Sequence, residues 1–203
     1  YEVDQSSSFT TNSSEILGII YGEGRWGDFD NDGDFDLLVS GGSPQGFNHI
    51  YKNTNGNFTS TEPTHTWQQY HGRSSVDWGD VDNDGDLDVV VMGNSAGYSA
   101  IYKNTDNGTG HGLSQKLITL ENGSARFGDY DNDGDLDLYM FGTKDANTSS
   151  TAYQFYQNTN GEFTAVTNSG SAMESSSRTT LEWGDYDNDG DLDFLQCGYG
   201  SGQ

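Results

Sequence analysis

Residues Asp28 to Asp36 read DFDNDGDFD, so that five aspartates alternate with other residues around a central Asn-Asp-Gly turn. The same pattern, D-x-D-N-D-G-D-x-D, returns at three further places, Asp80–Asp88, Asp129–Asp137 and Asp185–Asp193. Carboxylates this close together repel one another unless a cation lies among them. Calcium prefers about six to eight oxygen ligands and tolerates flexible geometry. The pattern therefore predicts four calcium-binding loops.

The four loops recur at a nearly regular spacing, their first residues being separated by 52, 49 and 56 positions. In each unit an aromatic-glycine pair precedes the loop and an apolar run follows it. A third segment comes next, such as Ile50–Asn53, and in three units it leads to an Asn-Gly turn and a threonine-containing segment. Asn-Gly is a strong hairpin signal because both residues can adopt positive φ. Four short strands in a unit of about 50 residues, without helical periodicity, predict an all-β fold, a β-propeller of four-stranded blades.

The two ends of the chain resemble the two halves of one unit. Tyr1–Gln5 and Ser8–Thr11 resemble the third and fourth segments, whereas Phe194–Leu195 belongs to a second segment. We therefore expect residues 1–203 to form a single domain of four repeats, in which the N- and C-terminal strands together close the last blade. Such closure removes exposed sheet edges.

A charged residue precedes each aromatic-glycine pair, and its sign alternates along the chain. These residues are Arg25, Asp77, Arg126 and Glu182. In a ring of four blades each would neighbour two opposite charges, which predicts a ring of ion pairs at the centre. The alternative interpretation is four exposed strand charges in accidental order.

The aromatic-glycine-aspartate lead, the acidic loop and the following apolar strand resemble FG-GAP/VCBS repeats, the units of integrin-α-like calcium-binding propellers. The resemblance covers all four units and implies calcium between the first and second strands of each blade. It implies side-chain ligands at loop positions one, three, five and nine, which are Asp28, Asp30, Asp32, Asp36, Asp80, Asp82, Asp84, Asp88, Asp129, Asp131, Asp133, Asp137, Asp185, Asp187, Asp189 and Asp193. It implies backbone carbonyl ligands at position seven, which are Asp34, Asp86, Asp135 and Asp191.

Integrin-like propellers resemble seven-bladed rings, and this chain has four units. A small closed ring, two chains that make eight blades, and a segment of a longer array remain open.

EF-hands begin with a similar loop but need a glutamate at position twelve and flanking helices. Position twelve is Val39, Val91, Met140 or Gln196, in segments that are strand-like. A solvated acidic tail is a further alternative, which the flanking strand patterns disfavour.

Cys197 lies in a predicted strand and is expected to be buried as a small apolar residue.

The formal net charge of −24 disfavours nucleic acid and anionic membrane surfaces as partners. The chain contains no apolar run long enough for membrane insertion. Loops with weak calcium affinity belong outside the cell, where calcium is near millimolar. Five N-x-S/T sequons, at Asn12, Asn57, Asn107, Asn122 and Asn147, would make the chain a glycoprotein in a eukaryotic secretory pathway.

We expect a non-enzymatic extracellular module for adhesion or assembly at the cell surface, with a protein or glycan ligand or with self-association. The alternative is a calcium-dependent carbohydrate-binding lectin. The aromatic and amide side chains of Trp67–Arg73 would suit recognition of a ligand, but packing between blades is the favoured interpretation.

Overall fold

The computed structural model describes residues 2–3, 9–10, 16, 20–42, 47–61, 74–93, 98–105, 108, 111–144, 151–167 and 176–200. Within these residues the chain forms antiparallel sheets and no helix, which confirms the predicted all-β class. No helical span that could cross a membrane exists in this part of the chain.

Three sheets have four strands each, in chain order from one edge to the other. The first contains β3 (Ile20–Gly27), β4 (Asp36–Gly42), β5 (Phe47–Thr54) and β6 (Asn57–Ser60). The second contains β7 (Ser75–Gly79), β8 (Asp88–Met92), β9 (Ser99–Asn104) and β10 (His111–Leu117). The third contains β11 (Glu121–Gly128), β12 (Asp137–Thr143), β13 (Thr151–Thr159) and β14 (Glu162–Ala165). A fourth sheet has two strands, β15 (Ser176–Gly184) and β16 (Asp193–Gly200).

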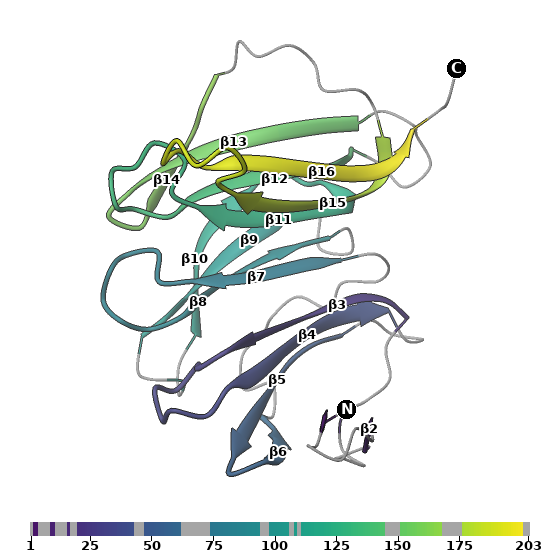
Figure 1. Cartoon of the computed structure of the whole chain (residues 1–203), viewed down its shortest axis with the longest axis vertical. Helices are drawn as coiled ribbons and strands as arrows, with labels where there is room; N and C mark the ends of the chain where they lie inside the picture. The colour runs from purple at the N-terminus through teal and green to yellow at the C-terminus, as the bar shows by residue number, and fades with distance from the viewer. Residues whose placement is uncertain are drawn as a thin grey trace.

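Neighbouring sheets pack face to face in chain order (Figure 1), and apolar clusters lie between them. Leu38 and Ile50 of the first sheet pack with valines of the second, such as Val89. Further apolar clusters join the second sheet to the third and the third to the fourth. Both faces of the middle sheets are covered, which explains why β8 and β12 are continuous apolar runs rather than alternating ones.

Two of the three predicted Asn-Gly turns form, and Asn107 of the third lies outside the described residues. Asn55 and Gly56 have φ of 53° and 84°, and Asn160 and Gly161 have φ of 51° and 84°. Positive φ at two consecutive residues gives the type I′ turn that suits a tight hairpin. These turns set the pairing of the third and fourth strands in the first and third sheets.

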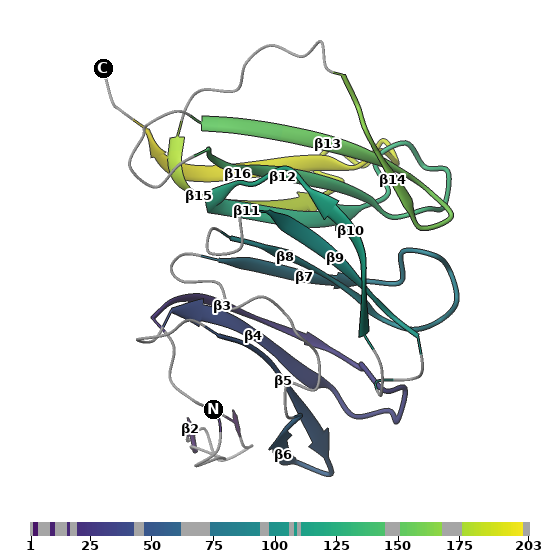
Figure 2. The same cartoon turned by 180° about the vertical axis from the view of Figure 1, so that it is seen from behind.

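The expected joint blade of N- and C-terminal strands is not formed in this structure. β1 (Glu2–Val3) pairs only with β2 (Phe9–Thr10), and β15 pairs with β16, as two separate sheets. The hairpin β1–β2 lies at the opposite end of the stack from β16 (Figures 1 and 2). A hairpin closes over a few residues, whereas pairing of the two chain ends must overcome a much larger loop-closure entropy.

The hairpin β1–β2 nevertheless has the register expected of an outer hairpin. In each such hairpin a Phe-Thr pair of the last strand faces two consecutive residues of the strand before it. The pairs are Val3–Phe9 and Glu2–Thr10, Asn53–Phe58 and Lys52–Thr59, and Asn158–Phe163 and Gln157–Thr164. The hairpin β1–β2 therefore pairs as the outer hairpins of the first and third sheets do, whereas its place in a complete unit stays a prediction.

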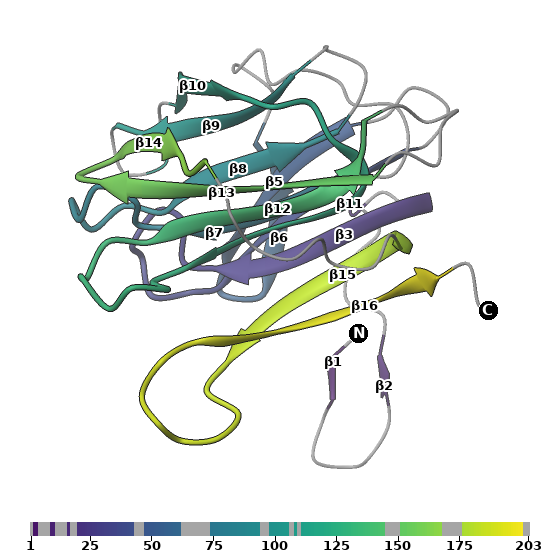
Figure 3. The same cartoon turned by 90° about the horizontal axis from the view of Figure 1, so that it is seen from above.

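The first strands of the four sheets, β3, β7, β11 and β15, gather near one another (Figure 3). Their alternating charges meet there, and three of the four ion pairs of the predicted ring are found among the described residues. Arg25 Nε lies 3.6 Å from Asp77 Oδ1, and Arg25 Nη2 lies 3.1 Å from Glu182 Oε1. Arg126 Nε lies 3.6 Å from Glu182 Oε1.

Glu23 joins this network, although no sequence pattern singled it out. Its carboxylate lies 3.0 Å from Arg25 Nη2 and also contacts the guanidinium of Arg126. Burial raises the pKa of Asp77 to about 6, against the lowering effects of the Phe127 amide and of the two arginines. The cluster therefore combines three acids with two arginines.

Cys197 is exposed in this structure, so the expectation of a buried cysteine was wrong. It lies on β16, a strand that has one neighbour where β4, β8 and β12 each have two. The expectation that Cys197 is buried assumed a further strand paired with β16 on its outer side.

Candidate metal centres

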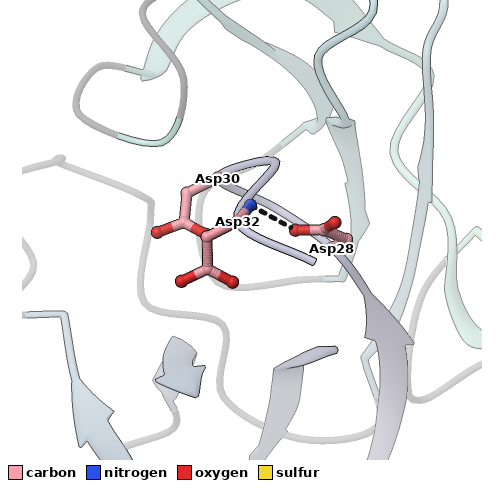
Figure 4. Close-up of side chains that lie close together, drawn as sticks. All are labelled: Asp28, Asp30 and Asp32. Carbon is pink, nitrogen blue, oxygen red and sulfur yellow. Dashed lines mark hydrogen bonds between the residues drawn. The ribbon is translucent and has the colours of Figure 1, made fainter. Parts of the chain in front are cut away.

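Each acidic loop is organised by its first aspartate. Asp28 Oδ1 accepts a hydrogen bond from the amide of Asp32 at 3.0 Å, and its Oδ2 accepts one from the amide of Gly33 at 3.0 Å (Figure 4). The same two bonds occur in the other three loops, at 2.9 to 3.2 Å. Asn31 and Gly33 have φ of 57° and 92°, a conformation that asparagine and glycine tolerate best. The Asn-Asp-Gly turn thus folds the loop around its own first carboxylate.

Three aspartates of each loop bring carboxylate oxygens within 4.8 Å of one another. The four clusters are Asp28, Asp30 and Asp32; Asp80, Asp82 and Asp88; Asp129, Asp131 and Asp137; and Asp185, Asp187 and Asp193. Figure 4 shows the first of them. Positions one and three belong to every cluster, whereas position five belongs to the first and position nine to the others. Three of the four side chains predicted as ligands in each loop are therefore gathered where a metal ion could be held. The fourth lies outside the described cluster in each loop, and these residues are Asp36, Asp84, Asp133 and Asp189.

In the first two loops the aspartate at position three has a carboxylate oxygen that lacks a hydrogen-bond partner. Asp30 has a side chain only 8% exposed, and its Oδ1 is buried without a hydrogen-bond donor. Asp82 Oδ1 is in the same condition. A buried carboxylate oxygen without a donor is costly, and a cation held by the cluster would remove that cost. The donor set, all oxygen, suits a hard cation such as calcium.

The aspartate at position nine ties the loop to the sheet. Asp88 Oδ2 accepts a hydrogen bond from the amide of Val81 at 3.0 Å, and its Oδ1 accepts one from the amide of Asn104 at 2.8 Å. Burial raises the pKa of Asp88 to about 6, and it does the same for Asp137. Asp36 has the same two bonds and a pKa raised by the same cause.

The side chains at position seven turn away from the clusters. Asp34 Oδ2 accepts a hydrogen bond from the amide of Asn55 at 2.7 Å, and Asp135 Oδ2 accepts one from the amide of Asn160 at 2.9 Å. None of these side chains belongs to a described cluster. Their role as backbone carbonyl ligands stays a prediction.

The fourth position of each loop, an asparagine, links one loop to the next. Asn31 Nδ2 donates to Asp86 Oδ1 at 2.9 Å, and Asn83 Nδ2 donates to Asp135 Oδ1 at 2.8 Å. Asn132 Nδ2 donates to Asp191 Oδ1 at 2.7 Å. The sequence shows the asparagine in every loop, but nothing local indicates that its partner lies in the following loop.

The third strand places one more polar side chain beside each of the first three loops. Lys52 and Lys103 contact Asp30 and Asp82, and Gln157 donates to Asp131. These three residues were not predicted as neighbours of the loops. The available signal was their shared position between a tyrosine and an asparagine in three units.

The other predicted positions fall mostly outside the described residues. Trp67–Arg73 lies there, as do the sequon asparagines Asn12, Asn107 and Asn147. Asn57 is exposed on β6, whereas Asn122 donates to Thr143 Oγ1 at 3.2 Å.

Comparison with known families agrees with the repeat structure. A family model described as FG-GAP-like repeat matches residues 28–91, 88–140 and 142–195. Each matched segment includes at least one acidic loop together with the apolar strand that follows it. No curated protein matches the chain.

Proposed function

The chain belongs to the FG-GAP-like repeat family, and from that premise we propose that it is a calcium-stabilised β-propeller, a non-enzymatic extracellular module for adhesion or assembly. One observation carries the calcium assignment. The buried Oδ1 atoms of Asp30 and Asp82 lack donors within clusters made entirely of carboxylates.

Positions one, three, five and nine of each loop would hold the ion, together with the carbonyl of position seven. A bound divalent cation supplies the positive charge that offsets the repulsion among the aspartates. The loop joins the first strand of a sheet to the second, and position nine also bonds the third strand. Binding at the loop therefore stabilises three strands at once, which couples metal affinity to folding.

The propeller is supported by a contact that repeats between successive sheets. A Cβ added to Gly27 would lie 2.9 Å from Trp78 Nε1, and one added to Gly128 would lie 2.7 Å from Trp183 Nε1. Gly79 faces Phe127 in the same way. Each glycine leaves room for the aromatic ring of the following sheet, so that one rule builds all three interfaces.

Both halves of a fourth interface of this kind lie open. A Cβ on Gly184 would meet nothing within 4 Å, and Trp26, at the position of Trp183, is 61% exposed. Tyr186 is 84% exposed, whereas Phe29 at the same loop position is buried. Arg25 and Glu182 already join the two sheets at their first strands. We assign these surfaces to each other in a closed ring of four blades, with β1–β2 added beside β16.

The extracellular assignment depends on the number and type of the metal loops. Four all-carboxylate sites within 203 residues would be filled and useful where calcium is near millimolar. The role in adhesion or assembly is inferred from the repeated scaffold, whose shared loop and strand geometry serves stability rather than a reaction.

Calcium removal tests the proposal. Chain freed of metal on a chelating resin should bind four calcium ions in isothermal titration calorimetry. Its melting temperature should rise markedly with calcium and stay unchanged with magnesium, which keeps its water ligands and demands octahedral geometry. A melting temperature insensitive to calcium would contradict a structural role for the ion.

Sedimentation velocity with and without calcium tests assembly separately. Calcium-dependent self-association would support the assembly role. A chain that stays monomeric and instead gives calcium-dependent hits on a glycan array would support the lectin.

A further inference from the structure

In each of the three four-stranded sheets, one side chain of the third strand contacts the aspartate at loop position three, and its residue type differs between sheets. Lys52 on β5, Lys103 on β9 and Gln157 on β13 share one register position, each after a tyrosine and before an asparagine. The strand pairing brings all three to the same point of their loops.

Each of the three side chains contacts the equivalent oxygen, Oδ2, of the aspartate at position three in its own loop. Lys103 Nζ lies 3.1 Å from Asp82 Oδ2, and Gln157 Nε2 donates to Asp131 Oδ2 at 2.8 Å. The ammonium group of Lys52 contacts Asp30 Oδ2. In the first two loops the other oxygen, Oδ1, is the buried atom without a donor. The side chain thus holds one oxygen of the carboxylate and leaves the other for an ion.

The three contacts differ in charge, although their geometry is shared. A lysine places a positive charge beside a site for a divalent cation and repels it, whereas glutamine orients the carboxylate without charge. The repulsion acts through a partly buried environment at Lys103, whose Nζ lies against the turn at Gly161 of the next sheet. Lys52 is more exposed, so solvent screens its charge better.

We propose that this position sets the calcium affinity of its loop, so that the third loop fills at lower free calcium than the first and second. The inference rests on the proposed binding of calcium by the loops. Lys52, Lys103 and Gln157 thus act as positioning residues through the aspartate at loop position three. The charge of the side chain is what distinguishes the calcium affinity of one loop from that of another.

Amide resonances of the loop glycines report each site separately. In a calcium titration followed by ¹H–¹⁵N correlation spectra, the resonance of Gly134 should reach its midpoint at about tenfold lower calcium than that of Gly85, the scale expected for one nearby charge. Lys103→Gln should lower the midpoint of Gly85, and Gln157→Lys should raise that of Gly134. If the chain folds only as it binds calcium, all loop glycines share one midpoint. Lys103→Gln should then lower that midpoint, and Gln157→Lys should raise it.

Lys144→Gln is the matched control, because it removes one positive charge from an exposed residue at the end of β12. It should leave the midpoints nearly unchanged. Circular dichroism checks that each variant folds, and Lys52→Gln replaces Lys103→Gln if the latter does not.

The outcomes separate the two proposals. If no loop glycine responds to millimolar calcium, both the calcium assignment and this inference are wrong. If the glycines respond with equal midpoints, and the loop variants behave like Lys144→Gln, calcium binding stands and this inference is overturned.

Discussion

Asn83 Nδ2 lies 2.8 Å from Asp135 Oδ1, so the turn of the second acidic loop is hydrogen-bonded directly to the third loop. The equivalent bonds from Asn31 and Asn132 continue the connection through all four loops. Each links residues more than 50 positions apart in the sequence. The loops therefore form one connected layer, in which the conformation of one loop bears on the next.

Replacing Asn83 with glycine should weaken this connection. Glycine keeps the positive φ of 58° without strain and removes the amide. We expect a loss of about 1 kcal/mol in the free energy of unfolding, the usual contribution of one hydrogen bond. Denaturant unfolding in the presence of calcium measures it.

Asn160→Gly is the matched control for Asn83→Gly. Asn160 has a similar φ, 51°, and within the described residues only its backbone amide is hydrogen-bonded, to Asp135 Oδ2. The glycine effect on the unfolded chain is common to both variants. Equal losses in the two variants would show that the bond from Asn83 contributes nothing to stability.

Replacing Arg126 with methionine should be strongly destabilising. Its side chain is only 4% exposed, and it contacts Glu23 and donates to Ser75 Oγ at 3.1 Å. Removing it leaves the partly buried Glu23 with Arg25 as its remaining ion-pair partner, so we expect a loss of about 3 kcal/mol, the lower end of the cost of breaking a buried pair. Urea unfolding gives the value.

The double variant Glu23→Gln/Arg126→Met should recover part of that loss, because it removes one of the unpaired charges. A double variant as unstable as the sum of the single ones would mean that Glu23 and Arg126 do not act as a pair.

Acidification should affect the calcium-free and calcium-bound chains in opposite directions. In the calcium-free chain the pKa values of Asp88 and Asp137 are about 6, above the ordinary value of 3.8. A folded-state pKa above that of the unfolded state gives stability that is present at low pH and lost as the pH rises through about 6. The calcium-free chain should therefore melt at a higher temperature at pH 5 than at pH 7.5.

The calcium-bound chain should melt at a lower temperature at pH 5, because protons compete with the ion for the same carboxylates. Differential scanning calorimetry at both pH values, with resin-treated and calcium-saturated samples, measures the two slopes. Asp88→Asn should flatten the slope of the calcium-free chain. Parallel slopes would contradict the role of these aspartates in binding.

Glycine-to-alanine variants test the interfaces between sheets. Gly128→Ala would place a Cβ 2.7 Å from Trp183 Nε1 and should cost about 1–3 kcal/mol through overpacking. Gly184→Ala meets nothing in the open arrangement. In the closed ring it would meet Trp26 and should cost a similar amount. Thermal unfolding of both variants decides between the arrangements, and a neutral Gly184→Ala would contradict closure.

The acidic loops could be predicted from the sequence in detail because their contacts are local. The bonds from Asp28 to the amides of Asp32 and Gly33 span four and five residues. The positive φ values of Asn31 and Gly33 suit those residue types intrinsically. The Asn-Gly turns and the apolar second strands follow from the same short-range rules.

The charge network was only half predictable. The alternating signs of Arg25, Asp77, Arg126 and Glu182 indicated a ring, since each residue stands at the same place in its unit. Glu23 lies two residues before Arg25, on the same side of β3, and its contact with Arg126 depends on how closely the first and third sheets approach.

The sequence by itself determined the four loops, the strands that flank them and the register of the hairpins, because hydrogen bonds over a few residues and backbone preferences specify them. Only the tertiary structure decided which residues meet over long distances in the sequence. The asparagine of one loop meets the aspartate at position seven of the next loop, and the lysine or glutamine of a third strand meets the aspartate at position three. These relationships depend on the distance and angle between packed sheets, which result from side-chain packing over the whole stack.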